Sequence, residues 1–381
     1  MFPRLRFKKF DGDWIAVTLE SLAEVERGKF SVRPRNDPRY FGGEMPFIQT
    51  GDVTGSDVYL KGYTQTLNDD GIRVSKVFPA DTILITIAAN IGDTTITQYP
   101  VACPDSVVAI QPKQDKVNTI FLKNVIDLQK DNLDSQATQN AQKNINLQVL
   151  KPLKLIVPLK EEQTQIASFL SAVDEKISQL TQKLELLCQY KQGMMQKLFS
   201  QQIRFKADDG SEFGEWDYLE LNEVLDYEQP TKYIVKSTDY DSSYLTPVLT
   251  AGKTFILGYT NETSGIFEGD KENVIIFDDF TTAYKFVNFR FKVKSSAMKI
   301  LKLNHFQNNI FYIYSVFSLL NLPLGDEHKR RWISEYSKQE IPVPCLEEQT
   351  KISNFLSAID QKIEVVAQQI EQANPKKVNI L

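Results

Sequence analysis

The sequence predicts an α+β protein in which two globular, β-rich domains are joined and separated by long coiled-coil helices. Three observations predict this architecture: a nearly identical segment occurs twice, a heptad pattern follows each copy, and short β-type runs precede each copy. At 381 residues the chain is long enough for two domains with connectors. The two copies give the halves a pseudo-twofold internal repeat.

The repeat is a segment of 21 residues. Residues 157–177, VPLKEEQTQIASFLSAVDEKI, recur as residues 343–363, VPCLEEQTKISNFLSAIDQKI, without a gap and with 14 of 21 positions identical. A weaker repeat pairs Arg6, Phe7, Lys8 and Trp14 with Arg204, Phe205, Lys206 and Trp216. Between these repeats the halves diverge almost completely, which indicates one scaffold that carries two different variable regions.

Each repeat leads into a helix whose apolar residues step alternately by four and three, which is typical of a coiled coil. The first helix has Ile166, Leu170, Val173, Ile177, Leu180 and Leu184 at these positions, and the second has Ile352, Leu356, Ile359, Ile363, Val366 and Ile370. We expect Pro375 to end the second helix, about 12 residues shorter than the first. Because each apolar seam needs a partner, the helices pair within one chain or between two chains, and we favour one chain.

These patterns divide the chain into two β-rich domains, two helices and a tail. The predicted boundaries are 1–158 for the first domain, 159–200 for the central helix, 201–344 for the second domain, 345–374 for the C-terminal helix and 375–381 for the tail. Strands are expected at 46–49 and 82–87 and around 274–277 and 286–293. Apolar helical segments are expected at 120–133 and 310–322.

Composition and charge narrow the class of protein. The net charge of −5 argues against a protein that coats nucleic acid by charge alone, although local basic patches remain possible. The N-terminus carries no apolar signal segment, and the longest apolar stretch, 310–324, is too broken to cross a membrane. Three widely spaced cysteines, Cys103, Cys188 and Cys345, fit reduced thiols, so we expect a cytoplasmic protein.

The sequence contains no recognisable catalytic or metal-binding constellation, and we expect no cofactor. His305 and His328 have no partner at a spacing suited to a metal or a nucleophile. The segment 37–40, Asp-Pro-Arg-Tyr, faintly resembles a methyltransferase motif, but Arg39 replaces a proline and no Gly-rich cofactor loop accompanies it, so we interpret it as a turn.

Basic clusters are the candidate DNA-binding residues. The first consists of Arg27, Lys29, Arg33, Arg35 and Arg39, the second of Lys285, Arg290 and Lys292, and the third of Lys329, Arg330 and Arg331. The third cluster corresponds, 186 positions earlier, to Lys143 and Asn144. Each cluster is either solvated surface or a group of donors to phosphates and base edges.

The repeated helical segment and the preceding QKNIN at 142–146 resemble the conserved segments of type I restriction-modification specificity subunits. The stretch PFIQTGDVTG…VFPADTILITIAANIGDTTI resembles one type of target-recognition domain, and TPVLTAGKTFILGYT resembles another. The resemblance covers nearly the whole chain. It implies a non-catalytic subunit that reads a bipartite double-stranded DNA target, with the helices setting the separation of the half-sites. It also implies two adenine methyltransferase (modification) subunits docked on the repeats and a restriction subunit that joins the complex.

Two other classes compete with this interpretation. A self-contained methyltransferase would need a cofactor-binding βαβ unit, which we do not find in the sequence. A coiled-coil scaffold that binds proteins without DNA specificity would explain the heptads, but not two unlike β-rich regions in equivalent frames. The bases read by either domain do not follow from this sequence.

Overall fold

The computed structural model describes residues 6–88, 90–137, 144–250, 254–279, 281–305, 307–320, 322 and 332–378, with side chains as far as residue 373. The chain forms two compact units, residues 1–182 with 367–381 and residues 183–366, and each unit is described by itself. Within the described residues, no helix is both long and apolar enough to cross a membrane.

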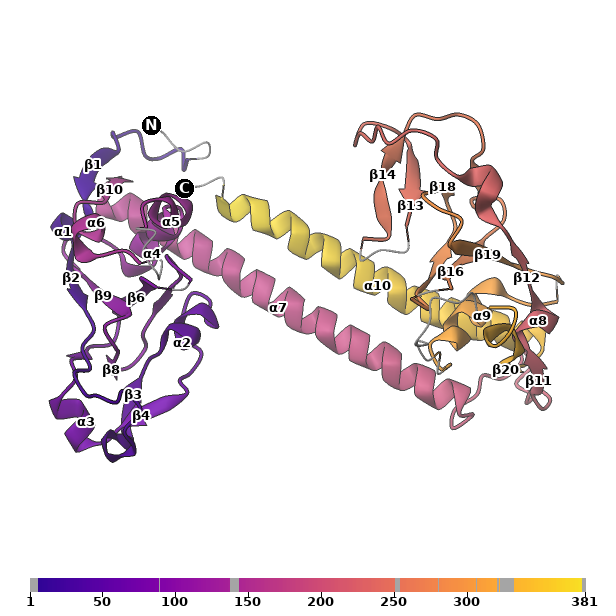
Figure 1. Cartoon of the computed structure of the whole chain (residues 1–381), viewed down its shortest axis with the longest axis horizontal. Coiled ribbons are helices and arrows are strands. Elements are labelled where there is room, and N and C mark those ends of the chain that lie inside the picture. The colour runs from indigo at the N-terminus through magenta and orange to yellow at the C-terminus, as the bar shows by residue number, and fades with distance from the viewer. Residues whose placement is uncertain are drawn as a thin grey trace. The chain divides into compact units, whose positions relative to one another are not determined.

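The described strands of the first unit form one two-stranded and two four-stranded sheets (Figure 1). In the two-stranded sheet, β1 (Ile15–Thr18) runs antiparallel to β10 (Lys154–Val157). One four-stranded sheet has the order β2 (Ala23–Arg27), β9 (Val107–Pro112), β6 (Ile83–Thr86), β7 (Thr94–Ile96). The other has the order β4 (Gln65–Leu67), β3 (Phe41–Phe47), β8 (Val101–Ala102), β5 (Val77–Phe78).

Strand β6 shows how the core of this unit is organised. All four of its residues are buried, and successive side chains point to opposite faces of the sheet. Ile83 and Ile85 belong to the core that includes α4 (Thr119–Asp127), whereas Leu84 belongs to a second core that includes Phe78 of β5. The strand expected at 82–87 is therefore confirmed, and burial of both faces explains its continuous apolar run.

Short helices complete the first unit. The helical segment expected at 120–133 is divided between α4 and α5 (Lys130–Ser135). The remaining short helices are α1 (Leu19–Leu22), η1 (Pro38–Tyr40), α2 (Thr50–Thr54), α3 (Asp69–Arg73) and α6 (Leu147–Leu150).

The second unit repeats this strand order, although the sequences of the two variable regions are unlike. Strand β11 (Asp217–Glu220) pairs antiparallel with β20 (Glu340–Val343). The four-stranded sheets are β12 (Leu225–Glu228), β19 (Met298–Leu303), β16 (Val274–Asp278), β17 (Tyr284–Val287), and β14 (Ile256–Thr260), β13 (Thr246–Leu249), β18 (Arg290–Val293), β15 (Phe267–Glu268). Each strand corresponds to the one numbered ten lower in the first unit, and the parallel pair β13–β18 corresponds to β3–β8.

The side chains of β16 alternate between two cores as those of β6 do. Ile275 and Phe277 pack in the core that includes α9 (Ile310–Phe317), and Val274 and Ile276 pack in the core between the two sheets. Strand β16 and helix α9 were both expected. The strand expected around 286–293, however, is divided between β17 and β18. The short helices of this unit are α8 (Leu221–Val224), η2 (Pro230–Tyr233) and η3 (Tyr336–Lys338).

The two long helices follow the repeated segments: α7 (Lys160–Phe199) has 40 residues and α10 (Leu346–Val378) has 33. The expectation that Pro375 ends the second helix is wrong, because α10 continues to Val378. Proline has a helix-compatible φ and removes one backbone hydrogen bond, and the cost of that loss is smallest near a helix end.

Within the second unit, α7 and α10 run antiparallel and contact each other. Lys191 Nζ lies 2.6 Å from Asp360 Oδ1, and the rings of Tyr190 and Phe355 are 6.5 Å apart. Lys191 interrupts the apolar seam of α7, and Asp360 supplies the partner that a half-buried ammonium needs. Of the expected seam residues, the buried ones are Ile166, Leu170, Leu180, Ile352, Leu356, Ile359 and Val366, and the half-buried ones are Val173, Ile177, Leu184, Ile363 and Ile370.

Candidate nucleic-acid interface

The second glutamate of the first Glu-Glu-Gln segment binds the arginine and the tryptophan of the N-terminal repeat. Arg6 Nε and Nη2 donate to the two carboxylate oxygens of Glu162 at 2.7 and 2.8 Å, and Trp14 Nε1 donates to Oε1 at 3.4 Å. Glu162 is buried, so the bidentate arginine supplies the charge partner that its carboxylate requires. We call this arrangement the Arg–Glu–Trp contact.

The second unit contains the same contact. Arg204 Nε and Nη2 donate to the two carboxylate oxygens of Glu348 at 3.1 and 2.7 Å, and Trp216 Nε1 donates to Oε2 at 2.9 Å. The sequence analysis noted the repeated arginine and tryptophan but did not identify the repeated glutamate as their common partner. The contact binds the segment before each β-rich domain to the first turns of the long helix that follows the domain.

The glutamine of each Glu-Glu-Gln segment makes a second link to its domain. Gln163 Oε1 accepts a hydrogen bond from the backbone N–H of Asn118 at 3.0 Å, and Gln349 Oε1 accepts one from Asn309 at 2.9 Å. Asn118 and Asn309 are the N-cap residues of α4 and α9, and their side chains accept from the first turn of each helix. The repeated segment thus connects α7 to α4 in the first unit and α10 to α9 in the second.

The first basic cluster begins at the end of β2, where the backbone approaches another segment closely. A Cβ atom added to Gly28 would lie 2.3 Å from the carbonyl oxygen of Pro104, so this position requires glycine. The backbone N–H of Lys29 donates to the carbonyl oxygen of Cys103 at 2.9 Å. This backbone places the side chains of Arg27 and Lys29 at the surface, where neither forms an ion pair with a described residue.

The other three arginines of this cluster have partners within the first unit. Arg33 Nη1 donates to the carbonyl oxygen of the preceding residue at 2.8 Å, and Arg35 Nη2 lies 2.8 Å from Asp105 Oδ2. Arg39 pairs with Asp37 at 2.6 Å, and this hydrogen bond lowers the pKa of the Asp37 carboxyl. Asp37 also accepts from the backbone N–H of Arg39, so the segment 37–40 forms the expected turn.

A hollow of about 290 Å³ lies beside Arg35. Phe30 and Phe47, both buried and with ring centroids 5.0 Å apart, are among the residues that line it. Arg35, Gln49 and Gln65 also line it, and Gln49 Nε2 donates to Gln65 Oε1 at 3.1 Å. Charged and amide donors therefore surround an apolar surface.

The two exposed residues of the second basic cluster, which lies in the second unit, differ in their ion-pair partners. Lys285 is exposed and forms no ion pair with a described residue. Arg290 is exposed as well, but it binds Glu268 at 2.5 Å and Asp270 at 3.2 Å. These acidic partners would have to be displaced or shared before Arg290 could bind a phosphate.

Lys292 corrects one of our expectations. Its side chain is 2% exposed, and its ammonium lies 3.0 Å from Glu262 Oε2 and donates to the carbonyl oxygen of Ser264 at 2.7 Å. In β18, Lys292 lies on the face opposite Phe291 and Val293, and its burial comes from the segment that contains Glu262 and Ser264, whose two groups satisfy it. Lys292 is therefore not accessible to DNA in this structure, and we assign it to the domain interior.

The third basic cluster, Lys329, Arg330 and Arg331, lies outside the described residues, as does Lys143. Asn144 is described: it is half-buried and forms an isolated β-bridge with Ala88. Asn144 therefore lies next to the turn between β6 and β7.

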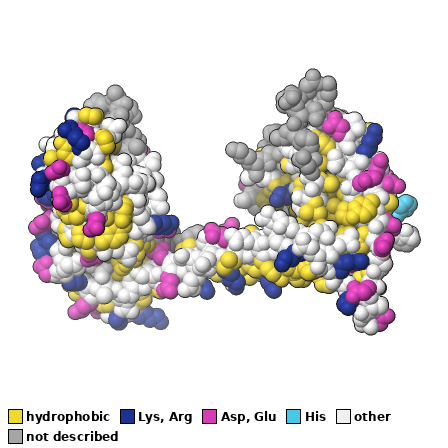
Figure 2. All heavy atoms as spheres, turned by 90° about the horizontal axis from the view of Figure 1, so that it is seen from below, with side chains coloured by type: hydrophobic (Ala, Val, Ile, Leu, Met, Phe, Trp, Pro, Cys, Tyr) yellow, Lys and Arg dark blue, Asp and Glu magenta, His cyan; other side chains and the backbone are white. Residues whose placement is uncertain are grey.

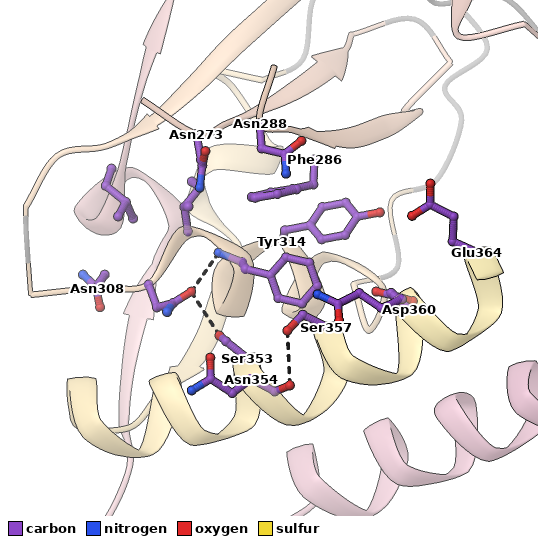
Figure 3. A pocket seen from close by; sticks show the side chains of 15 residues that line it. Asn273, Phe286, Asn288, Asn308, Tyr314, Ser353, Asn354, Ser357, Asp360 and Glu364 are labelled. Carbon is purple, nitrogen blue, oxygen red and sulfur yellow. Dashed lines mark hydrogen bonds between the residues drawn. The ribbon is translucent and has the colours of Figure 1, made fainter. Parts of the chain in front are cut away.

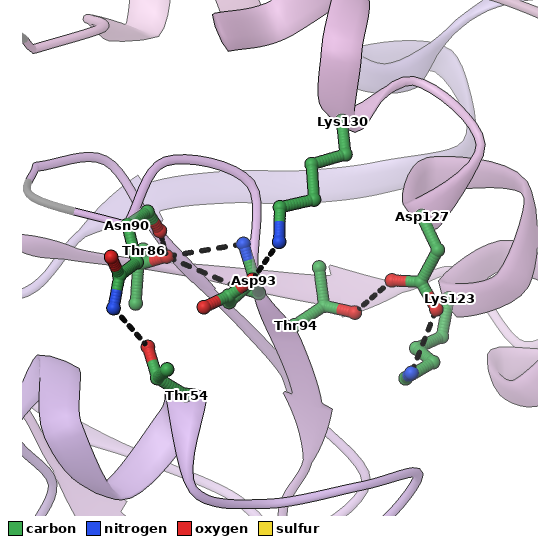
Figure 4. Close-up of polar contacts among 8 residues, drawn as sticks. All are labelled: Thr54, Thr86, Asn90, Asp93, Thr94, Lys123, Asp127 and Lys130. Carbon is green, nitrogen blue, oxygen red and sulfur yellow. Dashed lines mark hydrogen bonds and ion pairs between the residues drawn. The ribbon is translucent and has the colours of Figure 1, made fainter. Parts of the chain in front are cut away.

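Polar contacts hold this β6–β7 turn (Figure 4). Thr86 Oγ1 accepts from the backbone N–H of Asp93 at 3.2 Å, and Lys130 Nζ lies 2.5 Å from Asp93 Oδ1. Thr94 Oγ1 donates to Asp127 of α4. The hydrogen bond from Lys130 to Asp93 raises the pKa of the lysine. This lysine thus holds the turn in place.

A larger hollow of about 700 Å³ lies in the second unit beside α10 (Figure 3). Amide groups of Asn273 and Asn288, the rings of Phe286 and Tyr314, and the carboxylate of Asp360 are among the groups that line it. The described lining includes no lysine or arginine, so the hollow is poorly suited to a phosphate group.

The fold and the exposed basic side chains define a class of protein. Its members have two β-rich domains of one topology, and each domain is bound to a repeated long helix and carries basic and amide side chains at its surface. A family model, the type I restriction modification DNA specificity domain, matches residues 11–188 and 214–374. The chain therefore belongs to the type I restriction-modification specificity family, whose members are the non-catalytic specificity subunits of these systems.

Individual relatives agree with this assignment. The EcoR124I/EcoR124II specificity subunit of Escherichia coli is 46% identical over 169 residues, a match that spans 43% of this chain and 42% of that protein. The putative MjaX specificity subunit of Methanocaldococcus jannaschii is 24% identical over 100% of this chain and 95% of that protein.

Solved structures share the fold. The S subunit of a type I restriction-modification system from M. genitalium has a TM-score of 0.68 at 16% identity, covering 100% of this chain and 98% of that one. A chain from a structural study of complex assembly in a type I restriction-modification system has a TM-score of 0.53 at 13% identity, with 98% of both chains covered.

Proposed function

We propose that this chain gives a type I restriction-modification complex its DNA sequence specificity, with each β-rich domain reading one half of a bipartite target. The observation that carries the proposal is the repeated plan: one strand order, one Arg–Glu–Trp contact and one helical segment occur twice, whereas the variable regions differ. Such a plan positions two readers in the same way and allows them to prefer different bases. The expected location follows from the target, since a reader of chromosomal DNA in a bacterium or archaeon works in the cytoplasm.

The charge distribution supports specific rather than indiscriminate binding. On the face seen in Figure 2, Lys and Arg side chains are interspersed with Asp and Glu. Arg27, Lys29 and Lys285, which are exposed and form no ion pair with described residues, are our first candidates for phosphate contacts. The net charge of −5 is consistent with partner subunits supplying further phosphate contacts.

The long helices are the proposed docking surface for two methyltransferase subunits, and the restriction subunit would join through that assembly. Leu186 and Tyr190 of α7 and Val365 of α10 expose 58%, 51% and 51% of their surface. Exposed apolar side chains on a helix are stabilised when a partner covers them. These three residues lie outside the repeated segments 157–177 and 343–363, which are themselves present twice and suit two copies of one partner.

The test is to express the chain with the methyltransferase encoded beside it and to map adenine methylation across the genome. We expect methylation at one bipartite sequence when both proteins are present and none when either is omitted. A complex that forms but methylates without sequence preference would instead favour a protein-binding scaffold.

A further inference from the structure

We propose that the hollow beside Arg35 reads a guanine through its major-groove edge, with Arg35 as the reading residue and Asp105 as its positioning residue. This inference rests on the proposed DNA-reading function and assigns one site within it. It concerns the first unit alone, and every residue that it uses is described in the structure.

The geometry of Arg35 is the first observation. One guanidinium nitrogen, Nη2, is held by Asp105 Oδ2 at 2.8 Å, and the side chain is still 50% exposed. Within the described residues, Nε and Nη1 of Arg35 make no hydrogen bond, and Nη2 has a second N–H beside the one that Asp105 accepts. One of the two parallel N–H pairs of the guanidinium, Nε with Nη2 or Nη1 with Nη2, therefore remains at the surface. A guanidinium fixed in this way loses less rotamer freedom when it binds a planar partner.

The other donor of the hollow is the second observation. Gln65 Oε1 is occupied by the amide of Gln49, which leaves Gln65 Nε2 as the group available to a ligand. Gln65 is exposed, and both glutamines line the hollow with Arg35. The hollow therefore presents donors from two directions over an apolar surface formed in part by Phe30 and Phe47.

Guanine is the base whose edge matches this set. Its major-groove edge presents two adjacent acceptors, N7 and O6, whereas adenine presents one acceptor and one donor. Arginine binds the guanine pair with two parallel hydrogen bonds, which is the commonest specific base contact. A donor such as Gln65 Nε2 would meet the exocyclic donor of adenine unfavourably and would donate to the carbonyl oxygen of guanine.

Other arginines of the first unit differ from Arg35 in ways that provide controls. Arg73 also pairs with an aspartate, Asp70, at 3.1 Å and is exposed, but neither residue lines the hollow or belongs to a basic cluster. Nη1 of Arg33 donates to the backbone carbonyl oxygens of Phe30 and Val32, at 3.4 and 2.8 Å. Arg73→Ala is therefore a matched control for Arg35→Ala, and Asp70→Asn is a matched control for Asp105→Asn.

The first experiment uses the complex of the full chain with its methyltransferase and reads the methylated target of each variant by genome-wide mapping. We expect Arg35→Ala to relax one G·C position in one half-site and to leave the other half-site unchanged. Arg35→Lys should relax the same position, because a lysine cannot make the paired contact. Asp105→Asn should weaken the preference there, and neither control should change the target.

The second experiment measures binding of the complex to duplexes in which 7-deazaguanine replaces the guanine at that position, which removes the N7 acceptor. We expect binding by the unaltered complex to weaken by up to roughly 5- to 150-fold, the range for a whole bidentate base contact, because the replacement removes one of its two acceptors. Binding by the Arg35→Ala complex should be nearly insensitive to the replacement, whereas the Arg73→Ala complex should behave like the unaltered one.

Two results would overturn the inference while leaving the proposed function intact. Arg35→Ala could keep full discrimination at every position, or it could lose affinity equally for all sequences, which would make Arg35 a surface or a phosphate-binding residue. Thermal unfolding of the variants checks that an exposed substitution has not disturbed the fold. Absence of any sequence-specific methylation by the unaltered complex would overturn the proposed function itself, and this inference with it.

Discussion

Arg204 and Glu348 are 144 residues apart in the sequence, yet the guanidinium of the first binds both carboxylate oxygens of the second, at 3.1 and 2.7 Å. Glu348 is fully buried and also accepts a hydrogen bond from Trp216. The equivalent contact between Arg6 and Glu162 has the same donor and acceptor atoms. The repeated Glu-Glu-Gln segment therefore has a structural role: it closes each domain onto its helix.

We predict that Arg204→Ala lowers the free energy of unfolding of the second unit by about 1–3 kcal/mol, because a buried carboxylate loses its charged partner while the outer side of the arginine is already partly hydrated. In a Trp14→Phe background, the remaining tryptophans, Trp216 and Trp332, lie in this unit, so their fluorescence in urea reports its unfolding. Lys206→Ala, which removes an exposed ion pair with Glu212, is the control and should have little effect. Equal destabilisation by the two substitutions would contradict the role assigned to Arg204.

We predict that Lys292→Met destabilises the second unit by on the order of 3 kcal/mol, because it leaves the largely buried Glu262 carboxylate without its ammonium partner. Burial raises the pKa of Glu262, but hydrogen bonds from Ser237 N–H, Lys292 and Lys236 N–H outweigh burial and lower it. A lowered pKa gives stability that is present above the unfolded value, about 4.3, and is lost as the pH falls through the folded value.

The difference in stability between the unaltered chain and Lys292→Met should therefore shrink on acidification below about pH 4. Urea titrations at several pH values measure it. Lys285→Met, an exposed change in the same cluster, provides the comparison and should be near neutral. A fully stable Lys292→Met chain with weakened DNA binding would restore Lys292 to the DNA-binding residues.

We predict that replacing Arg27 and Lys29 with alanine weakens DNA binding by a similar factor for all sequences, as expected for phosphate contacts. The slope of log K against log salt should become shallower by about one for each charge removed. Titration of the complex with target and non-target duplexes at several salt concentrations tests this. A change in the preferred bases with an unchanged slope would identify base contacts instead.

We predict that the helices act as a ruler. Seven residues added to both α7 and α10 keep the heptad seam in phase and lengthen each helix by about 10 Å. At 3.4 Å per base step, the unread spacer of the target should grow by one to about three base pairs, with both half-sites unchanged. Mapping of methylated sites shows the spacer directly. Full activity with the original spacer would mean that the helices do not set the distance.

The parts of the fold that could be predicted from sequence are those in which the local pattern and the tertiary environment agree. The apolar run at β6 is buried on both faces, and the heptads of α7 and α10 supply a continuous apolar stripe. The shared strand order of the two units could not be predicted from the variable regions, because different side chains can pack in the core of the same sheets. The end of α10 was missed because a proline near a terminus costs little.

The candidate site was harder to predict because charge alone does not reveal burial or pairing. Lys292 and Lys285 are both lysines of the second cluster, and only the geometry shows that one faces Glu262 and the other faces solvent. The role of Asp105 as the partner of Arg35 could not be predicted from the sequence, because it depends on the distance between the two side chains in the fold. The partner of Arg204 could have been suspected, because the arginine and the glutamate recur together in both halves.

The most direct test of the central claim replaces residues 15–157 with the corresponding domain of a relative that has a different target, and maps methylation by the complex. If each domain reads one half-site, one half of the target changes to that of the donor protein and the other half stays as it was. A change in both halves, or no change in either, would contradict the division of recognition between the two domains.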